Sequence, residues 1–205
     1  MEFRRQAIQS GMTNLVRNLQ DHQSLLLPPD VAQGRKNPLW MGLPCRLRRT
    51  RQQANLSARQ VSLSAKCSNN STSVLEAGSH VPRIDVVERM AVALGVSPVW
   101  LGFGPEGDMP FRQKQPRWRV IEDEPIPRPG EGVFADRYKG CAERLKGSRE
   151  RLGLSLRELS AAAQVSYQAV LYTESGQTVP RIDTIEAIAV ALDVAPGWLA
   201  YGEDQ

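Results

Sequence analysis

The chain has 205 residues, of which 41% are hydrophobic, and a formal net charge of +4. This length allows one large or two small domains. No long apolar run occurs, and the apolar residues 25–27 are followed by two prolines, so the sequence predicts neither a transmembrane helix nor a secretory signal. Cys45, Cys67 and Cys141 are odd in number and widely spaced, which indicates neither a disulfide framework nor a zinc site. We therefore expect a cytoplasmic protein without a metal or other cofactor.

An amphipathic helix is predicted within residues 1–41. Apolar side chains recur there at steps of three, four or seven residues, at Ile8, Met12, Leu15, Leu19 and Leu26. These steps place them on one face of a helix, which His22 interrupts. Packing of this helix on the following domain and pairing with a second chain are the two alternatives.

A long stretch of the sequence is present twice. Residues 43–104 align without a gap to 141–202, at an offset of 98 residues, and 26 of the 62 aligned positions are identical. This duplication predicts a first domain over 42–104 and a second over 136–205. The intervening segment 105–135 is rich in proline and carries charges of both signs, which is typical of a stiff, extended linker.

Positive charge is concentrated in the first copy. Residues 42–104 carry eight Lys or Arg against three Asp or Glu, whereas 136–202 carry eight of each. Four of the basic residues lie within six positions: Arg46, Arg48, Arg49 and Arg51. Such a cluster suits phosphate groups, and the alternative is an ordinary solvated helix face.

The second copy carries clear helix signals. Ser155 is followed three positions later by Glu158, a capping box that predicts the start of a helix. Ser166 is positioned to cap a second short helix, "YQAVLYTE", and Gly176 allows the positive φ that ends it.

Three further helices complete the second copy. One covers 137–151, another follows the apolar spacing from Ile182 to Leu192, and a last turn opens at Pro196. The sequence therefore predicts five short helices and no strand in each copy, with Trp100 and Trp198 closing the two cores.

Two helices joined by a short turn form a helix-turn-helix unit. The second copy reads "LSLRELSAAAQVSYQAVLYTESG", then "PRIDTIEAIAVALDV" and "WLAYG". Over 139–202 it resembles the lambda-repressor-like (Xre-type, Cro/repressor) helix-turn-helix family, and the first copy matches by its alignment to the second. The resemblance implies an all-α fold with two tandem five-helix DNA-binding domains joined by the Pro-rich linker.

The resemblance also implies that the helix after the turn enters the DNA major groove by its N-terminal end. The expected base-reading residues are Asn69, Asn70 and Ser73 in the first copy, and Tyr167, Gln168, Leu171 and Tyr172 in the second. Gln and Asn can make bidentate pairs with adenine, and an apolar side chain can touch the thymine methyl group. The alternative for Asn69, Asn70 and Gln168 is a structural polar role without DNA contact.

Phosphate contacts are expected from basic and hydroxyl side chains near these helices. The candidates are Arg46, Arg49, Arg59, Ser68, Arg83, Arg157, Ser166 and Arg181. Contacts of this kind hold the protein in register on the duplex but carry no sequence information. The alternative for the arginines that recur in both copies is an ion pair with a nearby carboxylate.

Several positions depart from the family pattern, among them three in the turns and the first core. The turn between the two helices usually carries Gly, but Lys66 and Gln164 stand there. In the first copy Thr72 occupies the inward position that Val170 holds in the second. A buried hydroxyl weakens packing unless it is hydrogen-bonded, so the first domain is expected to be the less stable one.

The main functional hypothesis is a sequence-specific regulator of transcription that binds double-stranded DNA and reads an asymmetric or pseudo-palindromic operator. It would be a nucleoid-associated protein of bacterial or phage type and not an enzyme, since no catalytic motif is found. The alternative is a protein-interaction module on the same scaffold, such as an antitoxin or anti-activator. RNA polymerase, a regulatory protein and a second chain in a homodimer are further possible partners. Pairing of the two domains inside one chain is the alternative to the homodimer. No contact with a membrane is expected.

Overall fold

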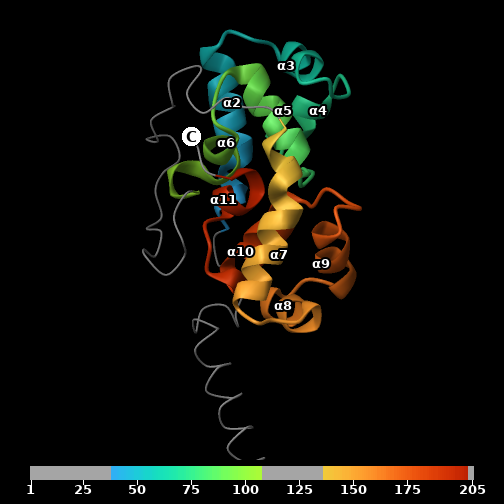
Figure 1. The fold of residues 1–205 in the computed structure, drawn as a ribbon. Coiled ribbons are helices and arrows are strands. Elements are labelled where there is room, and N and C mark those ends of the chain that lie inside the picture. The colour runs from blue at the N-terminus through green and yellow to red at the C-terminus, as the bar shows by residue number, and fades with distance from the viewer. Residues whose placement is uncertain (1–37, 108–135, 203–205) are drawn as a thin grey trace, which may run out of the picture. The chain divides into compact units, whose positions relative to one another are not determined.

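The computed structural model describes residues 38–107 and 136–202. The predicted N-terminal helix and nearly all of the predicted linker lie outside the described residues. The described residues belong to one compact unit, and they form ten α-helices in two similar halves and no strand (Figure 1). The expected all-α fold is therefore confirmed. None of the described helices has the length and apolar character needed to span a membrane.

The two halves have the same order of helices. The first contains η2 (Leu39–Gly42), α2 (Leu43–Gln53), α3 (Ala58–Ser64), α4 (Ser71–Glu76), α5 (Ile84–Leu94), α6 (Pro98–Phe103) and η3 (Gly104–Glu106). The second contains η5 (Arg137–Gly140), α7 (Cys141–Arg151), α8 (Leu156–Ala163), α9 (Tyr167–Glu174), α10 (Ile182–Leu192) and α11 (Pro196–Tyr201). We refer to these halves as the first and second copy.

The helix starts predicted in the second copy are confirmed. Ser155 accepts a hydrogen bond from the Glu158 N–H, and the Glu158 carboxylate accepts one from the Ser155 N–H, so α8 begins with a capping box. The Ser166 hydroxyl accepts a hydrogen bond from the N–H of Ala169 and caps α9. Ser57 and Gln60 form the corresponding capping box at α3 in the first copy.

The turn of each helix-turn-helix unit contains a residue in the left-handed backbone region. Lys66 has φ 53° and Gln164 has φ 55°. Glycine adopts this conformation without strain, which gives a physical reason for the glycine that the family usually has there. A side chain at such a position costs roughly 1–2 kcal/mol, so both copies tolerate some strain at the turn.

The hydroxyl expected to weaken the first core is satisfied. Thr72 is fully buried, and its hydroxyl lies 2.8 Å from the Ser62 hydroxyl and donates to the sulfur of Met90 at 3.5 Å. Ser62 also accepts a hydrogen bond from the Thr72 N–H at 3.0 Å. The Thr72 hydroxyl is thus hydrogen-bonded to side chains, one of them in α3, and it leaves no unpaired polar atom of Thr72 in the core.

The two copies pack against each other through equivalent segments. The N–H of Ile84 donates to the carbonyl of Pro180 at 3.1 Å, and the N–H of Ile182 donates to the carbonyl of Pro82 at 2.9 Å. The two bonds are equivalent, because each donor and each acceptor lies 98 positions from the matching residue of the other bond. The pairing therefore has a pseudo-twofold axis that passes between Arg83 and Arg181, which form an isolated antiparallel bridge.

A buried glutamate in each copy caps the start of the other copy. The Glu186 carboxylate in α10 accepts hydrogen bonds from the N–H groups of Leu39 at 2.8 Å and Trp40 at 3.0 Å. Its counterpart Glu88 in α5 accepts one from the N–H of Arg137 at 2.7 Å. Burial raises the pKa of Glu88, while the backbone hydrogen bonds oppose that rise. The N–H groups at the starts of η2 and η5 have no partner within their own helix, and these bonds satisfy them from the opposite copy.

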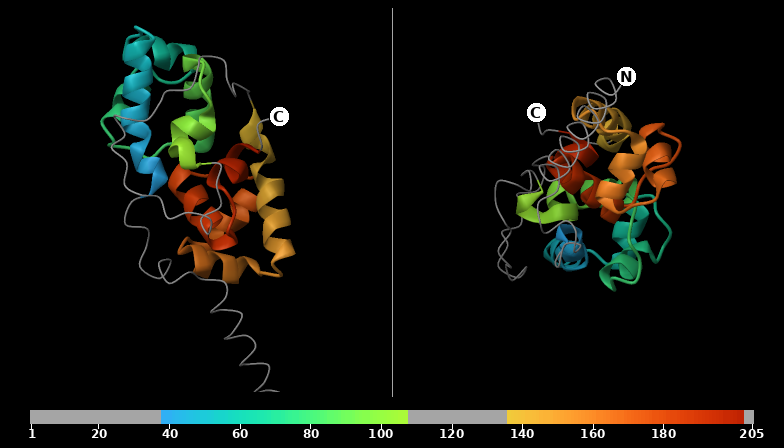
Figure 2. Two further views of the ribbon diagram at one scale, coloured as in Figure 1. Left: turned by 90° about the vertical axis from the view of Figure 1, so that its left-hand side faces the viewer. Right: turned by 90° about the horizontal axis from the view of Figure 1, so that it is seen from below.

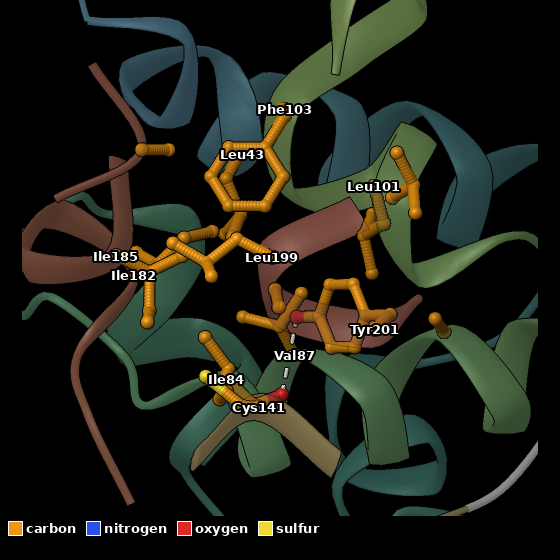
Figure 3. Close-up of a cluster of buried hydrophobic side chains, with 14 of the residues drawn as sticks. Leu43, Ile84, Val87, Leu101, Phe103, Cys141, Ile182, Ile185, Leu199 and Tyr201 are labelled. Atoms are coloured by element: carbon orange, nitrogen blue, oxygen red, sulfur yellow. Dashed lines mark hydrogen bonds between the residues drawn. The ribbon is translucent and has the colours of Figure 1, made fainter. Parts of the chain in front are cut away.

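Helices α6 and α11 meet across the pseudo-twofold axis in a shared apolar core. Figure 3 shows side chains of both copies in this core, with the hydroxyl of the fully buried Tyr201 donating to the carbonyl of Ile84 at 3.2 Å. Trp100 is buried and Trp198 is half-buried. Burial also raises the pKa of the Cys141 thiol to about 12, so this cysteine stays neutral and packs as a small apolar side chain.

Candidate nucleic-acid interface

The helices after the two turns, α4 and α9, lie on the same side of the compact unit. Both are on the right in Figure 1, and the view from below in Figure 2 places the same two segments on that side again. Because the pseudo-twofold axis relates the copies, these helices are equivalent elements turned toward one surface. This is the arrangement that allows two helix-turn-helix units to face one duplex.

The predicted base-reading residues of the second copy sit on α9 itself. Tyr167 and Gln168 form its first turn and are exposed, and Tyr172 is exposed one turn later. Leu171 is half-buried, and Val170 is fully buried against the core of this copy. The N-terminal end of α9 therefore offers an amide and two aromatic side chains to the surface.

In the first copy the equivalent residues precede the helix. Asn69 and Asn70 are exposed, but α4 begins only at Ser71. The Ser68 hydroxyl lies 2.6 Å from the Ser71 hydroxyl, and no side-chain cap bond is formed at the start of this helix. Asn69 and Asn70 therefore precede the helix instead of lying on its N-terminal end, and their role in base reading stays a prediction. Ser73 is exposed on α4.

An arginine–glutamate pair fastens each of these helices to the first helix of its copy. Arg149 in α7 meets the Glu174 carboxylate of α9 with two nitrogens, at 2.7 and 2.5 Å, and also donates to the carbonyl of Leu154 at 2.8 Å. Arg51 in α2 and Glu76 in α4 repeat this pairing at 2.5 and 2.9 Å. These pairs were not predicted from the sequence, although the arginine and the glutamate are each identical in the two copies.

Arg46 is not a phosphate-binding residue, which corrects the sequence prediction. Only 3% of it is exposed, and its guanidinium donates to the carbonyls of Leu101 at 3.0 Å, Gly102 at 2.9 Å and Leu39 at 3.0 Å. The charge binds the last turn of α6, where carbonyl groups lack helical partners. Its counterpart Arg144 binds the last turn of α11 in the same way, and burial lowers its pKa.

The arginine cluster of α2 therefore has a mainly structural use. Arg48 donates to the carbonyl of Glu76 at 3.1 Å, Arg51 pairs with the same residue, and Arg46 is buried. Arg49 is half-buried. Both sequence interpretations, a phosphate patch and a solvated face, fail for Arg46 and Arg51, because these side chains are largely buried on carbonyl and carboxylate groups of their own copy, whereas Arg48 is exposed.

The remaining phosphate candidates are at the surface. Arg59, Arg157, Ser68 and Ser166 are exposed near the starts of the helix-turn-helix helices. Ser166 also caps α9.

Arg83 and Arg181 occupy the pseudo-twofold axis and pair with carboxylates. Their side chains are 55% and 54% exposed, and each contacts the aspartate two positions later, Asp85 at 3.2 Å and Asp183 at 2.6 Å. The ion pairs that were the alternative for these arginines are therefore present, and a phosphate contact from their exposed side chains stays a prediction. The N–H groups of Ile84 and Ile182, the first residues of α5 and α10, are used in the contact between the copies and are not free for an anion.

The comparison with protein families agrees with this geometry. The model of a helix-turn-helix domain family matches residues 43–100, and that of a second helix-turn-helix family matches residues 145–199. No curated protein and no solved structure matches the chain significantly. The two matches fall on the two copies and include α2–α5 and α8–α10 entirely, with most of α7. The chain therefore belongs to the lambda-repressor-like (Xre-type) helix-turn-helix proteins, a DNA-binding family, and carries the domain twice.

Proposed function

We propose that this protein is a transcription regulator that binds one double-stranded DNA site with both of its helix-turn-helix units at once. The observation that carries the proposal is the pseudo-twofold pairing of the copies, with α4 and α9 on the same side. Two such helices related by a twofold axis suit successive major grooves, about one helical turn of DNA apart. One chain would then do what two identical subunits do in a dimeric repressor.

The two half-sites of this operator would differ. The second copy offers Tyr167, Gln168 and Tyr172 from a helix, whereas the first offers Asn69 and Asn70 from a turn. Gln and Asn both favour adenine, and the tyrosine rings of the second copy add apolar contact surface of the kind that can meet a thymine methyl group. Unlike recognition residues on a pseudo-symmetric scaffold favour a pseudo-palindromic site with a fixed orientation of the protein.

Backbone contacts would come from charged and hydroxyl groups around these helices. Arg59 and Arg157 are exposed in the first turns of α3 and α8, and Ser68 and Ser166 flank α4 and α9. Arg83 and Arg181 would contact the sugar–phosphate backbone near the centre of the site, between the two recognition helices. Binding through such contacts should weaken as salt rises.

Selection of bound sequences from random duplex DNA with the full chain, at two salt concentrations, tests the proposal. We expect an enriched motif with two unlike half-sites whose centres are about 10 base pairs apart. Gln168→Ala should relax the sequence preference in one half-site only, and Asn70→Ala in the other. Met41→Ala changes an exposed, uncharged residue outside both helix-turn-helix units and serves as the control.

Three results would count against this function. A motif with a single half-site would mean that only one copy reads DNA. Unchanged specificity in the Gln168→Ala, Asn70→Ala double variant would refute the assignment of base-reading residues. Enrichment of no motif, with binding that disappears as salt rises, would leave only non-specific attraction to phosphate.

A further inference from the structure

The contact between α6 and α11 is not symmetric in its side chains. Val99 and Gly197 are equivalent positions of the two copies, and they face each other across the pseudo-twofold axis. A Cβ atom built on Gly197 would overlap Cγ1 of Val99 and lie 3.1 Å from its Cγ2. Both residues are buried. The interface therefore accommodates one valine and one glycine at this point and has no room for a second side chain.

Two further equivalent pairs of α6 and α11 differ where these helices meet α10 and α5 of the opposite copy. Gly102 of α6 corresponds to Ala200 of α11, and a Cβ atom on Gly102 would lie 2.9 Å from Cδ1 of Ile182 in the other copy. Tyr201 donates a hydrogen bond across the interface to the carbonyl of Ile84. Its counterpart Phe103 has no hydroxyl and cannot make this bond. Each copy thus carries features that fit the opposite copy and not its own equivalent.

We propose that this interface pairs the first copy only with the second, and that Val99 and Gly197 are the residues that exclude pairing of like copies. Two first copies would bring Val99 against Val99 in a space that holds one valine side chain. Two second copies would set Gly197 against Gly197 and leave a void where Val99 packs. Pairing is specific because the unlike pair fits and both like pairs carry a steric defect.

This specificity has a consequence for assembly. If α6 accepts only α11, the pair that forms inside one chain leaves no matching surface for a further chain, and association stops there. The inference concerns the contact between the copies and does not depend on DNA binding. For the proposed regulator it would mean that every bound unit presents one α4 and one α9, so that operators with two identical halves are disfavoured.

Hydrogen exchange in the full chain without DNA tests the inference. The reporters are the N–H groups of Ile84 and Ile182, which bond across the interface. Gly197→Val sets valine against valine and should lower the protection of both amides at least tenfold. Adding Val99→Gly restores one valine opposite one glycine and should recover part of that protection, with full recovery limited by the Gly107 carbonyl, which lies 2.8 Å from a Cβ at position 197.

The control for the Gly→Val change is Gly147→Val in α7. A Cβ atom at this exposed helical glycine meets nothing within 4 Å, so the two reporter amides should keep their protection. Wild-type protection in Gly197→Val would overturn the proposal, because the interface would then tolerate valine against valine. Loss of protection that Val99→Gly does not relieve at all would also overturn it, because the defect would lie elsewhere than in the contact with Val99.

Discussion

The ion pair between Arg149 and Glu174 should make one of the larger side-chain contributions to the free energy that holds α9 against α7. The two side chains are 14% and 11% exposed, and two hydrogen bonds join them. Removing one partner of a buried ion pair costs about 3–5 kcal/mol, because the other charge is left without compensation. Partial exposure lets water reach the remaining charge, so we expect about 3 kcal/mol for Arg149→Ala and a similar value for Glu174→Ala.

A double-mutant cycle isolates the interaction itself. The double variant leaves no uncompensated charge, so its loss should be about 4 kcal/mol rather than the sum of the single losses, which gives a coupling energy of about 2 kcal/mol. Urea unfolding of the full chain measures all four proteins. Affinity for the selected DNA site should also fall in the single variants, because α9 is no longer held to α7.

The matched controls lie in the same chain. Arg151→Ala removes an exposed arginine from the end of α7 and should change stability by less than about 0.5 kcal/mol. The same cycle on Arg51 and Glu76 should give a similar coupling energy, since the geometry repeats in the first copy. A coupling energy below about 0.5 kcal/mol at Arg149 and Glu174 would place this pair among solvent-screened surface ion pairs and refute the reasoning.

Three other substitutions test separate features. Lys66→Gly relieves the left-handed strain at φ 53° and should raise stability by about 0.5–1 kcal/mol in thermal unfolding, whereas Lys66→Ala keeps the strain and should not. Tyr201→Phe gives α11 the ring of its counterpart in α6 and should cost about 1 kcal/mol in urea unfolding, the value of one lost hydrogen bond; no loss would mean that the bond is not formed. Burial raises the pKa of Glu88, so the stability that this group contributes is fully present below its ordinary pKa of 4.5 and is lost as pH rises through the folded-state pKa. Glu88→Gln should remove this pH dependence when urea unfolding is measured from pH 4 to 7. An unchanged pH profile in the variant would contradict the prediction.

The fold of the second copy could be predicted because its helix signals are local. The capping box at Ser155, the cap at Ser166 and the proline at the start of α11 each specify a boundary without help from tertiary structure. The start of α4 could not be predicted in the same way. Ser68 aligns with Ser166, but its hydroxyl bonds the hydroxyl of Ser71, and the helix begins later. The two asparagines therefore precede the helix, and the serine at position 68 did not signal its start.

The predicted phosphate contact of Arg46 was wrong because the prediction used its positive charge and not the face of the helix on which it lies. Arg46 lies on the buried face of α2 with Leu43, Leu47 and Thr50, at steps of three and four residues. That spacing is visible in the sequence and would have placed the arginine inward. The cross-copy contacts of Glu88 and Glu186 had a weaker signal, namely a glutamate kept in both copies within an apolar helix. Its partner could not be predicted, because the bond joins residues that are far apart in the sequence.

Duplication within one chain explains why the copies agree at some positions and differ at others. In a dimer of identical chains, a substitution at the twofold axis appears on both sides at once, so valine opposite glycine cannot arise. In this chain Val99 and Gly197 can change independently, and so can the residues at the starts of α4 and α9. The arginines and glutamates that fasten each scaffold remain identical, because each of them makes the same contact in its own copy. The change from valine to glycine at the axis therefore lets the copies pair as unlike partners, and on the proposed function the changes at the starts of α4 and α9 let them meet different bases.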